Sequence, residues 1–344
     1  MDLNKLLAFN QLFLDKSEAE KARLATQLDI DYEEYSKRIK GKEKEAEFLV
    51  ILKSMGCIMH LEAFDEGVSH ITNEYTPDYM VEMTDGYKMM IEVKHTDKDT
   101  YRISMGNLNK RIEFAQRHNL PLRFAVSLNG FWGLFTTETL LEKKGKLTIK
   151  DFGGEQSTSW LDQELETCSY MFPSNMKIRS VYSKDNKKGT WISNGSFGQL
   201  VSYELYCNDK KIFRMKGKES QFLIYTVYLE ALQNRLANSN QRIEQSANVT
   251  IVTESFDGVI NTIPEYEFLT APIKHIVSGS EDDITKYNAM IAVSKKDFKY
   301  FDKGILRVIL AFLVENGVDI IVFRDSKGYK FEDYAKIFWN KEKL

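Results

Sequence analysis

The chain has 344 residues, of which 43% are hydrophobic and 28% are charged, a composition typical of a folded protein with two domains. Its net charge of −3 at pH 7 excludes a polycation, so contact with nucleic acid would need local basic patches. Three widely spaced cysteines exclude a disulfide framework and a cysteine zinc cluster. No apolar run is long enough to span a membrane and the N-terminus lacks a signal-peptide pattern, so we expect a cytoplasmic protein without a membrane partner.

Residues 1–40 are predicted to form an N-terminal helical arm. Ser17 and Glu20 form a capping box that begins a helix. The segment 21–39 faintly resembles a helix-turn-helix, in which the second helix would begin near Asp31. Because that helix carries acidic residues that would repel phosphates, an arm used for packing or for dimer formation is the alternative interpretation.

Residues 41–145 alternate helices and strands, which predicts an α/β domain. We expect helices over residues 42–55 and 108–118. Strands are expected near residues 57–63, 79–83, 87–95, 123–128 and 131–136.

Residues 146–175 are predicted to be a loop-rich linker, because they contain a Gly-Gly pair and a long acidic stretch without lysine or arginine. Residues 176–344 are predicted to form a second domain of the α/β or α+β class. Its strands are expected near residues 199–206, 211–215, 249–254, 289–293 and 319–323, and its helices over residues 221–237 and 304–315.

Two strands joined by a tight turn carry the pattern that indicates chemistry. Glu92 and Lys94 are two residues apart on a predicted strand, so they share a face. Asp78 lies opposite Glu92 if the turn is a three-residue loop, Thr84-Asp85-Gly86, with Gly86 in the left-handed conformation. A two-residue turn would place Asp78 on the other face.

The hydrophobic pattern favours the three-residue loop. With this register one face of the hairpin carries only apolar and tyrosine side chains, and the charged residues gather on the other face, with Glu82 and Lys88 as a cross-strand ion pair. A slip of one residue would mix the two sets. Asp78, Glu92 and Lys94 are therefore expected to converge at one end of the hairpin.

Two carboxylates this close repel each other, and a hard divalent cation removes the conflict. Mg²⁺ suits two carboxylates and a backbone carbonyl, and a lysine beside it can orient a water molecule. These parts describe metal-assisted attack of water on a phosphodiester. An ion pair with a purely structural role is the alternative interpretation of Glu92 and Lys94.

Glu45 is expected on the same helix face as Phe48, Leu49 and Leu52, which are predicted to be buried. A carboxylate in that place is costly unless it is paired or bound to a metal. The alternative is that Glu45 lies one turn early on the helix and remains solvated.

The set Glu45, Asp78, Glu92 and Lys94 resembles the PD-(D/E)XK nuclease superfamily. Residues 41–136 are similar in particular to the nuclease domain of archaeal-type Holliday junction resolvases. The similarity is carried by the stretches GKEKEAEFLVILKSMGC, IEVKH and KRIEFAQRHNLPLRFAVSLNGFWGLF. The resemblance implies an α/β fold with a restriction-endonuclease-like mixed sheet flanked by helices, here with the N-terminal arm and the second domain added.

The resemblance also implies a Mg²⁺-dependent DNA endonuclease, in which Mn²⁺ would substitute and which would act as a homodimer. Asp78, Glu92 and the carbonyl of Val93 would bind the metal, Glu45 would bind the metal or its water, and Lys94 would orient the attacking water.

The chain is much longer than the small resolvases, which favours restriction-type or mobile-element target cleavage over junction cleavage. The alternatives are a junction- or structure-selective nuclease of recombination or repair, an inactive DNA-binding or assembly protein, and an RNA-directed or effector-gated nuclease.

Two groups of basic residues are predicted to contact DNA. The stretch 176–218 has ten lysines and arginines against three acids, and its loop contributes Lys184, Lys187 and Lys188. The alternative is that this loop is an exposed hairpin with no partner. A smaller basic patch comprises Arg102, Lys110, Arg111, Arg117 and Arg123.

Overall fold

The computed structural model describes residues 9, 16–64, 75–153, 156–185, 189–190, 192–217, 220–237, 240–258, 260–271, 303–324 and 327–339. The chain divides into two compact units. Apart from residues 54–56, the described residues up to Leu165 form the first unit and those from Glu166 onward form the second. The boundary therefore falls within the stretch predicted to be a linker.

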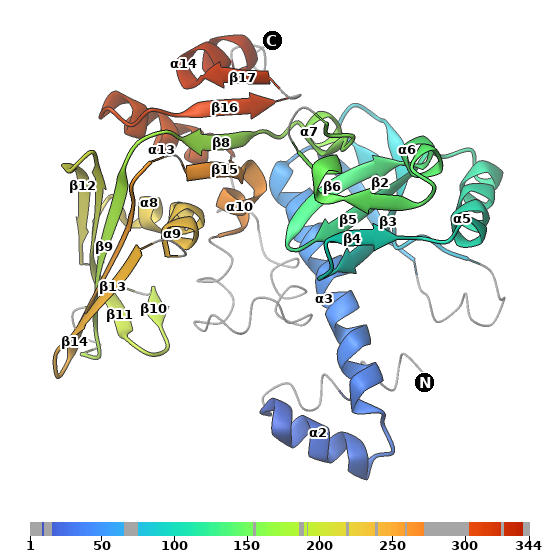
Figure 1. The fold of residues 1–344 in the computed structure, drawn as a ribbon, viewed down its shortest axis with the longest axis horizontal. Coiled ribbons are helices and arrows are strands. Elements are labelled where there is room, and N and C mark those ends of the chain that lie inside the picture. Colours follow the sequence, from blue (N-terminus) through green and yellow to red (C-terminus); the bar gives the residue numbers. More distant parts are fainter. Residues whose placement is uncertain are drawn as a thin grey trace. The chain divides into compact units, whose positions relative to one another are not determined.

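The first unit is built on a five-stranded mixed sheet of order β1-β2-β3-β5-β6 (Figure 1). Its strands are β1 (Ile58–Ala63), β2 (Tyr79–Met83), β3 (Lys88–Thr96), β5 (Leu122–Leu128) and β6 (Phe131–Thr136). Strands β3 and β5 are parallel and the other neighbours are antiparallel. The expected fold class, a mixed sheet flanked by helices, is confirmed.

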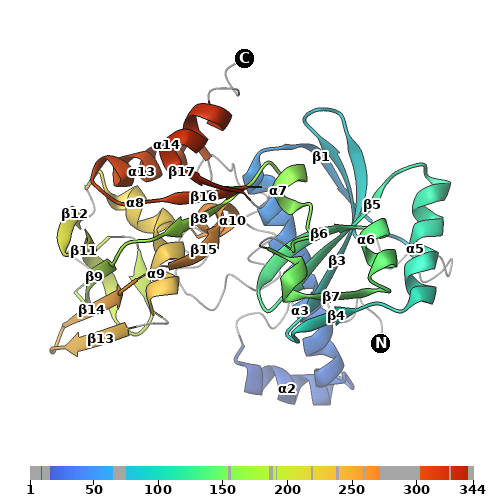
Figure 2. The same ribbon diagram turned by 45° about the horizontal axis from the view of Figure 1, so that its top comes forward.

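Helices cover both faces of this sheet. Helix α3 (Tyr32–Met55) packs on one face, where Phe48 contacts the ring of Trp132 at 4.9 Å between centroids. Helix α5 (Met105–Arg117) connects β3 to β5 and covers the other face, where Leu108 and Phe114 join the core with Met90 of β3. Met90 lies on the face of the hairpin that carries the charged residues, so the middle of that face is buried under α5. Figures 1 and 2 show α3 and α5 on opposite sides of the sheet.

The N-terminal arm departs from its prediction. Helix α2 (Glu18–Gln27) begins at the predicted capping box of Ser17 and Glu20. The next helix does begin near Asp31, whose carboxylate accepts hydrogen bonds from the backbone N–H groups of Glu33 and Glu34. However, it continues without a break to Met55. The predicted boundary between residues 40 and 41 lies inside this helix, because helical residues on both sides let the hydrogen-bond ladder propagate.

The remaining short elements of the first unit are β4 (Thr100–Arg102), α6 (Thr137–Glu142), β7 (Lys146–Thr148), η1 (Ile149–Asp151) and α7 (Leu161–Glu164). The last three lie within the predicted linker, which therefore contains more regular structure than its composition indicated. Strands β4 and β7 pair with each other. Asp151 is buried and accepts hydrogen bonds from the backbone and side chain of Thr148.

The second unit contains two antiparallel sheets, which makes it α+β. The larger has the order β10-β11-β9-β14-β13, with β12 paired to β11, and the smaller has the order β15-β8-β16-β17. Its strands are β8 (Ser169–Phe172), β9 (Met176–Ser183), β10 (Ser193–Asn194), β11 (Gly198–Cys207), β12 (Lys210–Lys216), β13 (Asn240–Gln245), β14 (Val249–Phe256), β15 (Ile260–Pro264), β16 (Ile321–Arg324) and β17 (Lys327–Lys330).

Its helices are α8 (Leu223–Tyr228), α9 (Glu230–Ala237), α10 (Glu265–Thr270), α13 (Lys303–Glu315), α14 (Phe331–Tyr334) and η4 (Ala335–Trp339). The helix predicted over residues 221–237 is thus two helices that meet at Leu229. The strand expected near residues 289–293 lies outside the described residues. No helix among the described residues is long and apolar enough to cross a membrane.

The continuity of α3 can be tested at Gly41, which lies in its interior with nothing near the position of an added Cβ. Glycine costs about 0.5–1 kcal/mol relative to alanine inside a helix. Gly41→Ala should therefore raise the free energy of unfolding by about that amount, as measured by urea denaturation.

Gly145→Ala is the matched control, because Gly145 has a φ of 71° and its Cβ would meet the Ile103 carbonyl, so that variant should be less stable than wild type. A Gly41→Ala protein no more stable than wild type would contradict a continuous helix.

Candidate active site

The register of the β2–β3 hairpin is the one predicted. Tyr79 pairs with Ile91 and Glu82 pairs with Lys88, so the turn is the three-residue loop, with Gly86 at a φ of 85°. Glu82 and Lys88 form the expected ion pair at 3.2 Å. Asp78 immediately precedes β2 and donates its backbone N–H to the Ile91 carbonyl, which places it across from Glu92.

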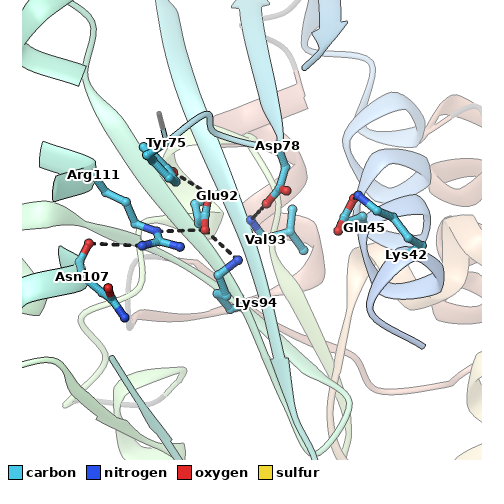
Figure 3. A network of polar contacts seen from close by, with 9 residues as sticks. All are labelled: Lys42, Glu45, Tyr75, Asp78, Glu92, Val93, Lys94, Asn107 and Arg111. Atoms are coloured by element: carbon cyan, nitrogen blue, oxygen red, sulfur yellow. Dashed lines mark hydrogen bonds and ion pairs between the residues drawn. The ribbon is translucent and has the colours of Figure 1, made fainter. Parts of the chain in front are cut away.

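Glu92 is the centre of a polar network (Figure 3). Only 2% of the residue is exposed. Its Oε1 accepts from Lys94 Nζ at 2.6 Å and from Arg111 Nε at 2.9 Å, and its Oε2 accepts from the Tyr75 hydroxyl at 2.5 Å. Burial acts to raise the pKa of Glu92, but the charges of Lys94 and Arg111 and the hydrogen bonds outweigh it and lower the pKa. Glu92 is therefore ionised at neutral pH.

Asp78 is buried beside this network and has fewer donors. Its Oδ2 accepts the backbone N–H of Val93 at 2.6 Å. Burial and the charge of Glu92 raise the pKa of Asp78 to about 8, against the opposing effect of Lys94. The negative charge of Glu92 thus disfavours ionisation of Asp78, which is the repulsion expected from the sequence.

Glu45 lies on α3, on the far side of Asp78 from Glu92 (Figure 3). Its side chain is 19% exposed and forms an ion pair with Lys42 at 2.8 Å, so it is less buried than the helical pattern predicted. Its charge also raises the pKa of Asp78, which places it within electrostatic reach. Among the described residues, however, no three histidine, cysteine or carboxylate side chains are gathered as a metal site.

Lys94 is partly exposed, and its ammonium group is directed at Glu92. Burial acts to lower the pKa of Lys94, but the charges of Glu92 and Asp78 outweigh it and raise the pKa. Lys94 is therefore protonated at neutral pH and donates its hydrogens to Glu92.

Two further residues belong to the site, and the sequence analysis assigned neither to it. Tyr75 donates to Glu92, and Arg111 stacks its guanidinium 4.5 Å from the centre of the Tyr75 ring. Arg111 was expected to contact DNA, but it is turned inward to Glu92. The helical period could have revealed this, because Arg111 lies three residues after Leu108 and four before Ala115, which are both buried. For Tyr75 the sequence offers no comparable signal.

The other basic residues predicted to contact DNA differ in their exposure. Arg102, Lys110 and Arg117 are exposed. Arg123 is largely buried and pairs with Glu164 at 2.6 Å. Lys184 is exposed on the second unit, and Lys187 and Lys188 lie outside the described residues.

Comparison with known proteins supports the resemblance seen in the motifs. Residues 36–158 match the family model of the archaeal Holliday junction resolvases, Hjc. A Holliday junction resolvase, Hjc, from the archaeal hyperthermophile Archaeoglobus fulgidus has 21% sequence identity and a TM-score of 0.28, covering 33% of this chain and 91% of that chain. No curated protein matches. The matched region contains Glu45, Asp78, Glu92 and Lys94 and ends before the second unit.

The raised pKa of Asp78 predicts how stability depends on pH. An unfolded aspartate titrates at about pH 4. Between that pH and about 8, Asp78 therefore holds a proton in the folded protein that it releases in the unfolded chain. Stability should consequently fall as pH rises through this range. Asp78→Asn removes the titration, so its advantage in melting temperature over wild type, measured in chelator, should grow between pH 5 and pH 8.

Glu82→Gln changes a more exposed carboxylate of the same hairpin and should retain the wild-type trend. Parallel curves for wild type and Asp78→Asn would show that the pKa of Asp78 is not raised in the folded protein.

Proposed function

We propose that the first unit is a nuclease domain that hydrolyses phosphodiester bonds in four-way DNA junctions. The observation that carries the proposal is the pairing of Asp78 with Glu92 at the end of the hairpin, with Lys94 directed at Glu92. The match of residues 36–158 to the resolvase family supports junction DNA as the substrate. It favours this function over the restriction-type cleavage that chain length suggested.

The donor set fits a hard divalent cation such as Mg²⁺. It offers two buried carboxylates, and such a cation would offset both the burial and the repulsion from Glu92 that raise the pKa of Asp78. Asp78, Glu92 and the Val93 carbonyl would hold the ion, Glu45 would hold it or its water, and Mn²⁺ would substitute. When bound, the ion supplies positive charge that stabilises the transition state of phosphodiester hydrolysis.

Lys94 would position the water that attacks phosphorus. Its ammonium group would act as a hydrogen-bond donor and as a positive charge. The carboxylate it contacts fixes its ammonium group. As water attacks phosphorus, the bond from phosphorus to the sugar oxygen breaks, the proton of the attacking water passes to solvent, and solvent supplies a proton to the leaving sugar oxygen. The lysine would balance the charge that develops on the phosphate.

Arg111 and Tyr75 would position Glu92. Between them they occupy both of its oxygens, and Arg111 keeps it ionised. A four-way junction offers two equivalent strands to cleave, so we expect two copies of the chain to act as a symmetric homodimer.

The substrate can be tested with a synthetic four-way junction, a plasmid, a linear duplex and RNA, each with Mg²⁺, Mn²⁺ or chelator. Paired nicks at the junction that require a metal are expected. Discrete plasmid fragments would instead support restriction-type cleavage. This is the second candidate, because the second unit lies outside the region that matches the resolvase family. Cleavage of RNA alone, or DNA binding without cleavage, would contradict the proposal.

Lys94→Ala should abolish or greatly slow cleavage while Mn²⁺ still binds, as measured by calorimetry, because the lysine acts on water and not on the ion. Lys88→Ala is the matched control and should cleave at the wild-type rate. Lys88 lies on the same strand as Lys94 but pairs with Glu82. If Lys94→Ala cleaves at the wild-type rate, the lysine has only a structural role.

Arg111→Gln should move the acidic limb of the pH–rate profile to higher pH. Arg111 lowers the pKa of Glu92, so its loss raises that pKa and more of the carboxylate is protonated at a given pH. A variant with a reduced rate but an unshifted profile would show that Arg111 only supports the fold.

A further inference from the structure

The larger sheet of the second unit has one apolar face and one charged face. Helix α9 contacts β9, β13 and β14 on the apolar side, and Figures 1 and 2 both show α8 and α9 on that side. Ile178, Leu205 and Phe213 are buried there. The alternate residues of β9, β11 and β12 point the other way and form what we call the open face, which carries Lys177, Arg179, Glu204, Lys211, Arg214 and Lys216.

The register explains why these residues gather. Glu204 on the middle strand β11 is paired with Arg179 of β9 on one side and Arg214 of β12 on the other. Glu204 is 5% exposed, and its carboxylate lies 2.9 Å from Lys211, 3.2 Å from Arg214 and 3.6 Å from Arg179. These three cations share one acid.

The open face therefore has a surplus of positive charge. Burial acts to raise the pKa of Glu204, but hydrogen bonds from Lys211 and Tyr206 outweigh it and lower the pKa, so this carboxylate supplies one negative charge against three positive ones. Lys177 is neutralised by Asp209 at 2.8 Å. Lys216 is exposed and has no ion pair among the residues that the structure describes. One buried carboxylate cannot neutralise this array, so it can bind an external anion.

The shape of the array indicates an extended anion. Neighbouring strands lie about 4.8 Å apart, so cations on three strands span about 10 Å, and Lys211 to Lys216 extend about 17 Å along β12. Arg179 lies directly across from Thr253 of β14. Arginine, lysine and hydroxyl side chains together are the groups that contact the phosphates of DNA.

We propose that the open face binds the sugar–phosphate backbone of DNA, independently of base sequence. The inference rests on the proposed function, since it gives the second unit a share in holding the same DNA substrate. It also places the contact on the sheet instead of on the loop with Lys184, Lys187 and Lys188.

The test compares DNA binding by two full-length double variants in chelator over a series of salt concentrations. Arg214→Gln with Lys216→Gln removes two charges and leaves Glu204 paired with Arg179 and Lys211. Lys327→Gln with Lys330→Gln removes two exposed lysines from β17 in the smaller sheet and is the matched control.

The open-face variant should bind more weakly than wild type, by the same factor for duplex and for junction. The magnitude of its slope of log K against log salt should be smaller by about 2, since each phosphate contact releases about one counterion on binding and two contacts are lost. The control should behave as wild type. Wild-type affinity and slope for the open-face variant would overturn the inference, as would binding to phosphatidylserine vesicles without binding to DNA.

Folding of each variant is checked by its melting temperature. If the double variant does not fold, Lys216→Gln alone should lower the slope by about 1, and an unchanged slope would overturn the inference. Cleavage by wild type with Mg²⁺ is measured separately. If the open-face variant binds DNA more weakly but wild type cleaves nothing, the proposed nuclease function is refuted and this inference stands. If wild type cleaves junctions but the open-face variant binds DNA as tightly as wild type, this inference is refuted and the nuclease function stands.

Discussion

The buried charge of Glu92 is the constraint on which the candidate site depends. A carboxylate inside a protein costs several kcal/mol unless donors compensate it. Glu92 is compensated by a tyrosine that precedes β2, a lysine on its own strand and an arginine on α5. Because all three donors must reach one side chain, this carboxylate fixes α5 and the segment before β2 against β3.

Asp78 shows what this arrangement costs. It is as buried as a core residue, yet most of the nearby donors are bound to Glu92. Its raised pKa records an unfavourable interaction that the fold tolerates. A raised pKa of this kind is typical of functional sites, and it is consistent with the proposal that a cation binds here.

A buried glutamate organises the charges around it in each of the two units. Glu92 and Asp78 lie beside the two cations Lys94 and Arg111, so the charges of this site balance when both carboxylates are ionised. Glu204 has three cations beside it, so the open face has a surplus of positive charge, and on this surplus rests the proposal that it binds phosphates. The net charge of the chain, −3, conceals this local surplus on the open face.

The sequence by itself determined the local features of the first unit. Alternation along 79–95 set the strands and the hairpin register, because a slip of one residue would have moved the charged residues into the apolar face. That register was enough to bring Asp78 across from Glu92. Capping residues likewise located the start of α2.

Only the tertiary structure decided which residues surround Glu92 and Glu204. Arg111 and Tyr75 come from segments that no local pattern connects to Glu92, and Arg179 meets Glu204 only through the pairing of β9 with β11. Strand β9 itself was not predicted. Charged side chains have no preferred face on a helix or strand until a neighbouring element buries them, and the order of strands in a sheet depends on contacts between residues far apart in the chain.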